Sequence, residues 1–160
     1  MAGPRRTRAR RANVTVTEET MIPAIRAKLQ ELATKEVLVG MEGDAELAMI
    51  AGVHEYGSAK MKIPARSFIG VGKKRATAPI SKRVKSGVQA IAEDTESVHT
   101  LLRDIGEIGL DRVLKRFDKI RQPALSPLYA AIKGNKKILI RDKDLRDSLT
   151  YKIVRKGART

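Results

Sequence analysis

A long apolar stripe with helical spacing is the feature that most limits what this chain can fold into. Between Val98 and Ile120, apolar residues recur every three or four positions, the pattern of one buried side of an α-helix. Asp94 or Thr95 is expected to cap the start of this helix. Gly106 and Gly109 lie inside it, and each costs about 1 kcal/mol against alanine. We therefore expect a bend there, or the close approach of another backbone. The stripe consists of Val98, Leu101, Leu102, Ile105, Ile108, Val113, Phe117 and Ile120.

A second helical stripe precedes the first. Thr77, two residues before Pro79, is expected to mark the start of this helix. The polar positions between the apolar ones carry Lys82, Arg83 and Lys85, which we expect to project away from the core as one basic face. The apolar residues of this stripe are Ile80, Val84, Val88 and Ile91.

Shorter elements surround these two helices. The residues over 18–34 have helical periodicity, those over 35–41 read as a strand rich in β-branched side chains, and those over 45–57 predict a helix ended by a glycine. Near the C-terminus we expect a short strand over 138–140, a tight helical turn and a strand over 148–154.

The fold class that follows is α+β. We expect a single domain over residues 18–160, in which a small antiparallel sheet packs with two long helices. The chain has 160 residues and no cysteine, so disulfides, thiolate metal sites and cysteine nucleophiles are excluded. No apolar run approaches the ~20 residues that span a bilayer, and a soluble protein made in the cytoplasm is expected.

Positive charge dominates the sequence. The formal net charge is +15, and such an excess attracts polyanions. Residues 1–17 are expected to form a flexible basic arm. The 37 residues between Glu55 and Glu93 hold nine cations and no acid. Candidate contacts for DNA or for an acidic partner are Arg5, Arg6, Arg8, Arg10, Arg11, Lys73, Lys74, Arg75, Lys82, Arg83 and Lys85.

Reactive residue types occur in the segment HEYGSAKMKIPARSF, residues 54–68. A zinc-peptidase motif needs a second histidine four residues after His54, but Ser58 stands there and the only other histidine is His99. We therefore expect no metal site, no cofactor and no catalytic residue. The mechanical interpretation is a structural joint, in which the chain leaves a helix at Gly57 and Phe68 packs into the core. Glu55 and Arg66 are hypothesised to form an ion pair across this loop.

The segment AMIAGVHEYGSAKMKIPARSFI resembles the signature of the tail-completion, or neck, proteins of long-tailed bacteriophages, a family also labelled virion morphogenesis proteins. LSPLYAAIKG, ILI and DLRDSLTYKIV lie at the matching distance downstream, so the resemblance covers about residues 20–155. This chain departs from the pattern at Ser67, which replaces a proline, at Tyr56, which replaces a phenylalanine, and at Asp142 and Lys143, which replace a Thr-Gly turn.

The resemblance implies a non-enzymatic virion component at the head-tail junction. Such proteins form rings around the DNA channel, and a hexamer is the ring it implies here, in contact with other neck, connector and tail proteins and with genomic DNA that passes non-specifically. Leu145 and Ser148 would fix the C-terminal strand. The candidate subunit or partner interface carried over is His54, Glu55, Tyr56, Gly57, Ile63, Pro64, Arg66 and Phe68.

Composition leaves a second function open, that of a free-standing basic nucleic-acid-binding protein. The oligomeric mass separates the two. A ring subunit forms a closed oligomer or assembles with neck or tail proteins, whereas the alternative is a monomer that binds duplex DNA with a steep salt dependence.

Overall fold

The computed structural model describes residues 20–42, 44–124, 127–133 and 144–158. The arm expected over 1–17 and the strand expected over 138–140 lie outside these residues. The elements in chain order are α1 (Ile22–Ala33), β1 (Lys35–Met41), α2 (Ala45–Tyr56), α3 (Ile69–Ala92), α4 (Val98–Lys119), α5 (Pro127–Lys133), α6 (Asp144–Asp147) and β2 (Leu149–Arg155). The α+β prediction, with two long helices and a small antiparallel sheet, is confirmed.

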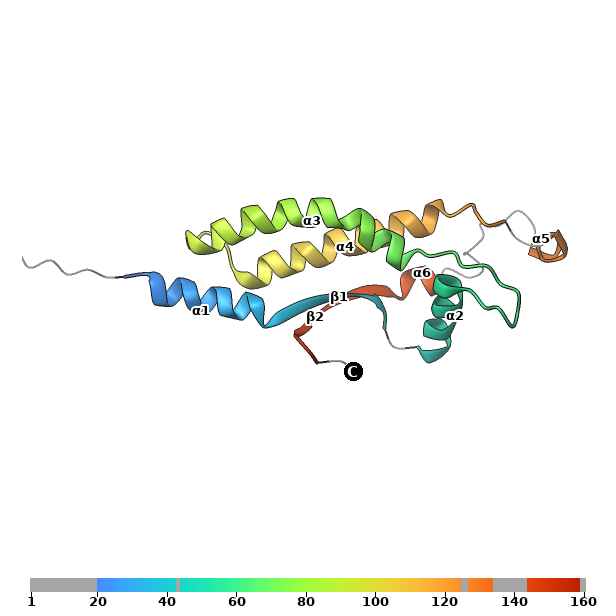
Figure 1. The fold of residues 1–160 in the computed structure, drawn as a ribbon, viewed down its shortest axis with the longest axis horizontal. Coiled ribbons are helices and arrows are strands. Elements are labelled where there is room, and N and C mark those ends of the chain that lie inside the picture. The colour runs from blue at the N-terminus through green and yellow to red at the C-terminus, as the bar shows by residue number, and fades with distance from the viewer. Residues whose placement is uncertain (1–19, 43, 125–126, 134–143, 159–160) are drawn as a thin grey trace, which may run out of the picture.

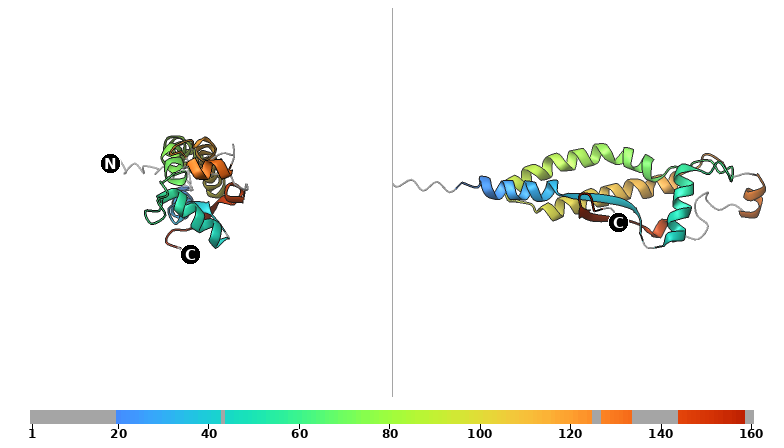
Figure 2. Two further views of the ribbon diagram at one scale, coloured as in Figure 1. Left: turned by 90° about the vertical axis from the view of Figure 1, so that its right-hand side faces the viewer. Right: turned by 60° about the horizontal axis from the view of Figure 1, so that its bottom comes forward.

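The molecule is elongated, and the two long helices lie along its length (Figure 1). The antiparallel helices α3 and α4 pack against each other, and α4 contacts both strands of the sheet. Helix α1 lies at one end of the long axis, whereas α2 and α6 lie towards the other (Figures 1 and 2). Among the described residues, no helix is long and apolar enough to cross a membrane.

The sheet consists of β1 and β2, which pair antiparallel over all seven residues of each strand. Tyr151 on β2 faces α4, where Gly106 makes room for its ring. A Cβ atom at Gly106 would lie 2.2 Å from Tyr151 Cδ2, and one at Gly109 would lie 3.0 Å from a methyl group of Val39. Side chains of the sheet, and not the second backbone that was predicted, therefore make the closest approach at both glycines.

Two apolar clusters form the core along α4. One gathers Phe68, Val113, Phe117, Leu145 and Leu149 with Ala51 and Ile120. The other contains Ile91, Val98, Leu101 and Leu102, against which Leu32, Val37 and Ile153 pack. Most of the stripe predicted over 98–120 is buried, and Ile105 and Ile108 are half-buried.

The predicted start of α3 is wrong. The helix begins at Ile69, and Pro79 lies inside it instead of near its start. A proline inside a helix removes a backbone hydrogen bond, so the sequence favoured a start just before it. The earlier turns are stabilised by packing: Ala76 is buried, and Gly72 lies so close to α4 that a Cβ atom there would be 2.7 Å from Val113 Cα.

The predicted cap of α4 is also wrong. Ser97 is the N-cap residue, and its hydroxyl oxygen accepts a hydrogen bond of 3.1 Å from the backbone N–H of Thr100. Asp94, predicted as an alternative cap, forms an ion pair with Lys28 of α1, while the Thr95 hydroxyl donates to the carbonyl of Ala90. Asp94, Thr95 and Ser97 can all cap a helix chemically, but a tertiary contact engages Asp94 and a local contact at the end of α3 engages Thr95.

Candidate assembly site

The loop between α2 and α3 begins at Gly57, whose φ is +78°. Its N–H donates to the carbonyl of Val53 at 2.8 Å and ends α2, as the sequence predicted. A Cβ atom at this position would lie 2.9 Å from both Ala65 N and Ile63 O. Only glycine combines this backbone conformation with so close a return of the chain.

The loop folds back on itself and then onto α2. Ser58 and Ile63 exchange two backbone hydrogen bonds of 2.8 and 2.9 Å. The backbone N–H of Arg66 then donates to the carbonyl of His54 at 2.6 Å. Residues 58–66 therefore form a closed turn tied to the last turn of α2.

Glu55 caps the helix that follows the loop. Its carboxylate accepts hydrogen bonds of 2.9 Å from the backbone N–H groups of Phe68, Ile69 and Gly70, and one of 2.6 Å from the Ser67 hydroxyl. Burial alone would raise the pKa of Glu55, but these donors outweigh it and hold the pKa below its ordinary value. The negative charge also lies at the positive end of the α3 dipole.

Arg66 is buried, with 5% of its surface exposed. Its guanidinium donates from Nε to the carbonyl of Pro123 at 2.9 Å and from Nη2 to that of Ala124 at 3.0 Å, beyond the end of α4. The hypothesised Glu55–Arg66 ion pair is therefore wrong. Glu55 instead accepts from backbone N–H groups at the start of α3, which have no partner within their helix. Arg66 donates to carbonyl groups of the segment that follows α4.

Phe68 lies at the centre of the joint and is fully buried. Its ring meets that of Phe117 edge to face, with centroids 5.2 Å apart. The prediction that Phe68 packs into the core is confirmed. Glu55, Arg66 and Phe68 together connect the end of α2, the start of α3 and the end of α4.

The eight residues predicted for an interface thus differ in accessibility. Arg66 and Phe68 are buried. Tyr56 has 85% of its surface exposed, and Pro64 is also exposed. The half-buried members are His54, Glu55, Gly57 and Ile63. The interface assignment stays a prediction, and Tyr56 and Pro64 are the members of this set whose side chains are exposed to solvent.

Further large apolar side chains are exposed on α2 and in the loop that follows it, and the sequence pattern did not single them out. Met49 on α2 and Met61 in the loop are 65% and 59% exposed. Residues 47–54 contain no acidic, lysine or arginine side chain, although only one side of α2 packs inward, through Ala51 and Ile50. The signal available in the sequence was this run of uncharged residues within a predicted helix, because a helix that is apolar on all sides has more apolar surface than one packed side can bury. Tyr56, Met49 and Met61 are called the α2-end surface below.

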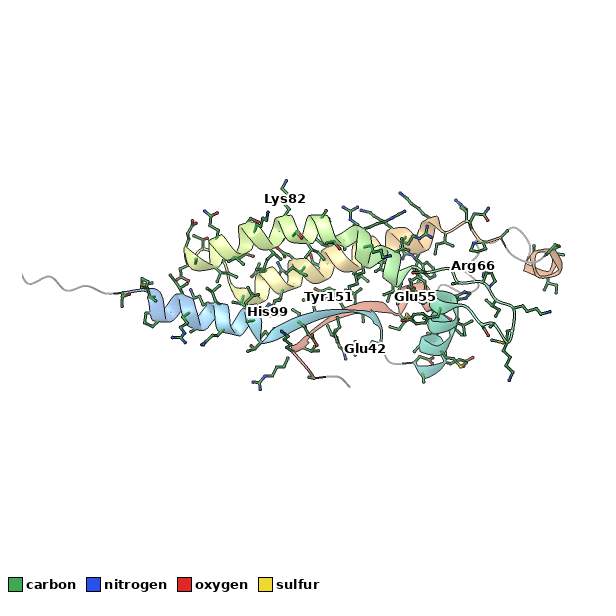
Figure 3. The ribbon with its side chains drawn as sticks, in the orientation of Figure 1. Glu42, Glu55, Arg66, Lys82, His99 and Tyr151 are labelled. Atoms are coloured by element: carbon green, nitrogen blue, oxygen red, sulfur yellow. The ribbon has the colours of Figure 1, made fainter. Side chains whose placement is uncertain are left out.

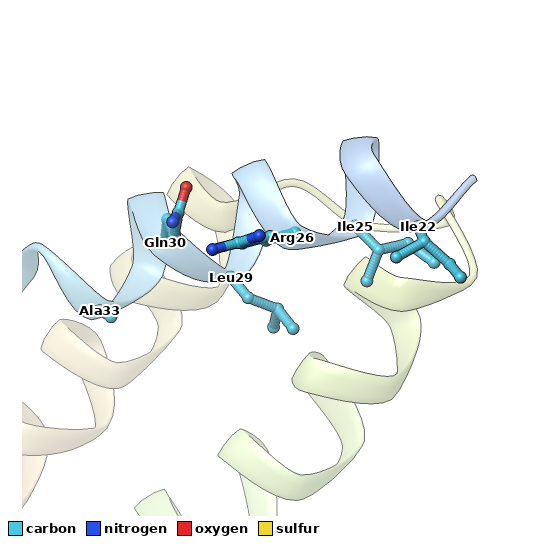
Figure 4. Close-up of a pocket in the computed structure, with 6 residues that line it drawn as sticks. All are labelled: Ile22, Ile25, Arg26, Leu29, Gln30 and Ala33. Atoms are coloured by element: carbon cyan, nitrogen blue, oxygen red, sulfur yellow. The ribbon is translucent and has the colours of Figure 1, made fainter. Parts of the chain in front are cut away.

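A second apolar surface lies on α1. Met21, Ile22 and Leu29 are 59%, 72% and 38% exposed, and α1 contains no buried residue. Ile22, Ile25 and Leu29 project from one side of the helix into a groove that Arg26, Gln30 and Ala33 complete (Figure 4). Met21, Ile22 and Leu29 are called the α1-end surface below.

The predicted basic face of α3 is present with one correction. Lys82 and Lys85 are exposed, but Arg83 turns towards α4, where its guanidinium donates to Asp104 at 2.8 Å and pairs with Glu96. Arg83 occupies a position between the polar and apolar sides of the helix, and two carboxylates reach it there. Lys73, Lys74 and Arg75 are exposed. The five arginines of the arm lie outside the described residues.

The two histidines lie apart in the fold, His54 in α2 and His99 in α4. In the described part of the chain, no three histidine, aspartate or glutamate side chains gather in a way that could hold a metal ion. No protein-family model, curated protein or solved structure matches this chain.

Proposed function

We propose that this chain is a structural subunit of the head-tail junction of a long-tailed bacteriophage. It completes the tail or connects it to the head as part of a ring, expected to be a hexamer, around the DNA channel. Its partners are further copies of itself and the adjoining neck, connector and tail proteins of the virion. The motif over residues 54–68 supports the choice of family, and the distribution of exposed apolar side chains supports the assembly role.

The observation that carries the proposal is that two separate apolar surfaces lie far apart along the length of an elongated molecule (Figure 1). The α1-end surface is on the helix at one end of the long axis, and the α2-end surface is on a helix that lies towards the other end, before α5 (Figure 1). A strongly charged chain that leaves isoleucine, methionine and tyrosine exposed has apolar area that a partner would cover. A helix such as α1, with no buried residue, gains stability when its apolar side is covered.

Two different surfaces suit a ring better than an isolated dimer. When the α1-end surface of one copy meets the α2-end surface of the next, the contact is heterologous. Each copy then offers one surface to the neighbour on either side, and a suitable rotation closes the ring. A dimer with twofold symmetry would instead use one surface twice.

The joint around Glu55 supports this role by fixing the loop in advance. Tyr56 lies between His54 and Gly57, whose backbone groups are tied to Arg66 and Val53. A contact residue on a rigid support loses little entropy when a neighbour binds. Glu55, Arg66 and Phe68 therefore contribute by holding Tyr56 and Pro64 in place.

A pair of complementary variants tests this assembly. Ile22→Gln with Leu29→Gln disables the α1-end surface, and Met49→Gln with Tyr56→Gln disables the α2-end surface. In native mass spectrometry, the parent chain is expected to form a closed oligomer and each double variant alone a monomer. A mixture of the two is expected to form a heterodimer and nothing larger, because each partner retains one working surface.

Leu38→Gln serves as the control, because Leu38 is 46% exposed but lies on β1, away from both surfaces. This control is expected to assemble like the parent. If one variant pairs with itself, the contact is isologous and the heterologous ring is wrong. If both variants assemble like the parent, neither surface is an interface.

A further inference from the structure

The solvent side of α3 has an unusual composition. Its exposed positions from Lys73 to Ser86 carry only lysine, arginine, serine, threonine and alanine. No acidic residue occurs anywhere in Ile69–Ala92. Lys82 points away from the body of the molecule on the side of α3 opposite the sheet (Figure 3). The cations at these exposed positions, called the α3 basic face below, are Lys73, Lys74, Arg75, Lys82 and Lys85.

The charge of this face is not neutralised within the described fold. Arg83 is the cation of α3 that forms ion pairs there, with Glu96 of the segment leading into α4 and with Asp104 of α4 itself. None of the five residues of the α3 basic face forms an ion pair with a described carboxylate. A concentrated cationic surface of this kind attracts a polyanion.

The side chains between the cations indicate which polyanion fits. A protein interface is held by apolar and aromatic side chains at its centre. The α3 basic face offers none, because the large exposed apolar residues are on α1, α2, α5, β1 and the segments before α1 and α3. Small residues such as Ala78 and Ser81 lie between the lysines and leave room for a backbone of phosphates to approach.

The spacing along the helix also suits a nucleic-acid backbone. Lys74 and Lys85 are eleven residues apart, which places them about 16 Å apart along the axis and about 20° apart around it. Lys82 lies between them, about 80° from Lys74 in the same direction around the axis. This length corresponds to about five base-pair steps of a duplex at ~3.4 Å each. Lysine heads at this spacing contact phosphates without reading bases.

We propose that the α3 basic face binds the phosphate backbone of double-stranded DNA, without sequence preference. The inference goes beyond the ring proposal, on which it depends only for the source of the DNA, the genome passing through the channel. A duplex-binding surface on α3 would exist in a single subunit as well. The experiment below therefore measures binding separately from assembly.

The test compares two triple variants of the full chain that carry the same change in charge. Lys74→Gln, Lys82→Gln and Lys85→Gln remove the face, whereas Lys60→Gln, Lys62→Gln and Lys156→Gln remove three exposed lysines elsewhere. Binding to a short fluorescent duplex of arbitrary sequence is measured by anisotropy over a series of salt concentrations. Native masses of both variants are recorded first, so that a failure to assemble is not mistaken for a failure to bind DNA.

The slope of log affinity against log salt is negative, and its magnitude is expected to fall by about 2.7 in the face variant, which is about 0.9 for each phosphate that a lysine no longer neutralises. The control variant is expected to keep its slope within about 1 of the parent. Equal decreases in the two variants would overturn the proposal, because net charge alone would then explain binding. Binding of poly-L-glutamate as tight as that of the duplex, with the same decrease in the face variant, would overturn the assignment to DNA.

Discussion

The carboxylate of Glu55 accepts a hydrogen bond of 2.9 Å from the backbone N–H of Phe68, thirteen residues further along the chain. Through this contact the last turn of one helix supplies the cap of the next. The N-cap residue Phe68 provides no side-chain cap of its own at the start of α3. One carboxylate thus links the end of α2 directly to the start of α3.

Replacing Glu55 by alanine is expected to lower the free energy of unfolding by about 1 to 3 kcal/mol, because three backbone N–H groups and the Ser67 hydroxyl lose their acceptor. Urea denaturation followed by circular dichroism measures the change. Glu107→Ala is the matched control, since Glu107 is an exposed carboxylate on α4 that pairs with exposed Arg103. A decrease no larger than that of the control would show that the cap contributes nothing.

The same cap predicts a pH dependence. Hydrogen bonds to the ionised form hold the pKa of Glu55 below its ordinary value, so its ionised form is favoured in the folded state. The stability that this carboxylate contributes is therefore complete above the unfolded pKa of about 4.3 and is lost as the pH falls through the lower folded pKa. The stability difference between the parent and Glu55→Gln should be constant near neutral pH and shrink below about pH 4. A difference that grows on acidification would contradict the arrangement.

The elements that the sequence predicted are those specified by nearby residues. The strand over 35–41 matches β1, and Gly57 follows the last residue of α2, because β-branched side chains and a glycine with positive φ act locally. The start of α3 was missed because its cap, Glu55, belongs to the preceding helix. Because this contact comes from outside residues 69–92, the periodicity of those residues alone could not locate the start of the helix.

The candidate site shows the same limit. Opposite charges suggested a Glu55–Arg66 pair, but in the fold both side chains meet backbone groups that only the tertiary arrangement exposes to them. Arg83 likewise looked like a member of the basic face, and its two carboxylate partners come from residues 96 and 104. The helical pattern placed Lys82 and Lys85 correctly, because they lie on the polar side of the helix.

Gly106 and Gly52 give opposite predictions for the same substitution. Alanine at Gly106 would place a Cβ atom against the ring of Tyr151, and overpacking of this kind costs about 1 to 3 kcal/mol. Alanine at Gly52 on α2 meets nothing within 4 Å and is expected to stabilise the helix by about 0.5 to 1 kcal/mol. Thermal unfolding of the two variants measures both effects. Similar changes in the two would mean that α4 and β2 are not in close contact at Gly106.

Arg66→Lys is expected to destabilise the protein although it preserves the charge. Lysine cannot reproduce the two directed hydrogen bonds to the carbonyls of Pro123 and Ala124, and the expected decrease in the free energy of unfolding is about 1 to 3 kcal/mol. Arg103→Lys, at a position whose side chain is 52% exposed, is the control and should change stability by less than about 0.5 kcal/mol. Chemical denaturation measures the free energy of unfolding of both variants. If Arg66→Lys is as stable as Arg103→Lys, the guanidinium of Arg66 does not hold the segment after α4.

Native mass spectrometry of the full chain, alone and mixed with tail and connector proteins of a long-tailed bacteriophage, tests the central claim most directly. The expected result is a single closed oligomer, or a complex of fixed stoichiometry that forms on mixing, and the absence of both in the α1-end and α2-end variants. A chain that remains monomeric in both settings while binding duplex DNA would contradict the assembly role. It would then support the free-standing nucleic-acid-binding protein instead.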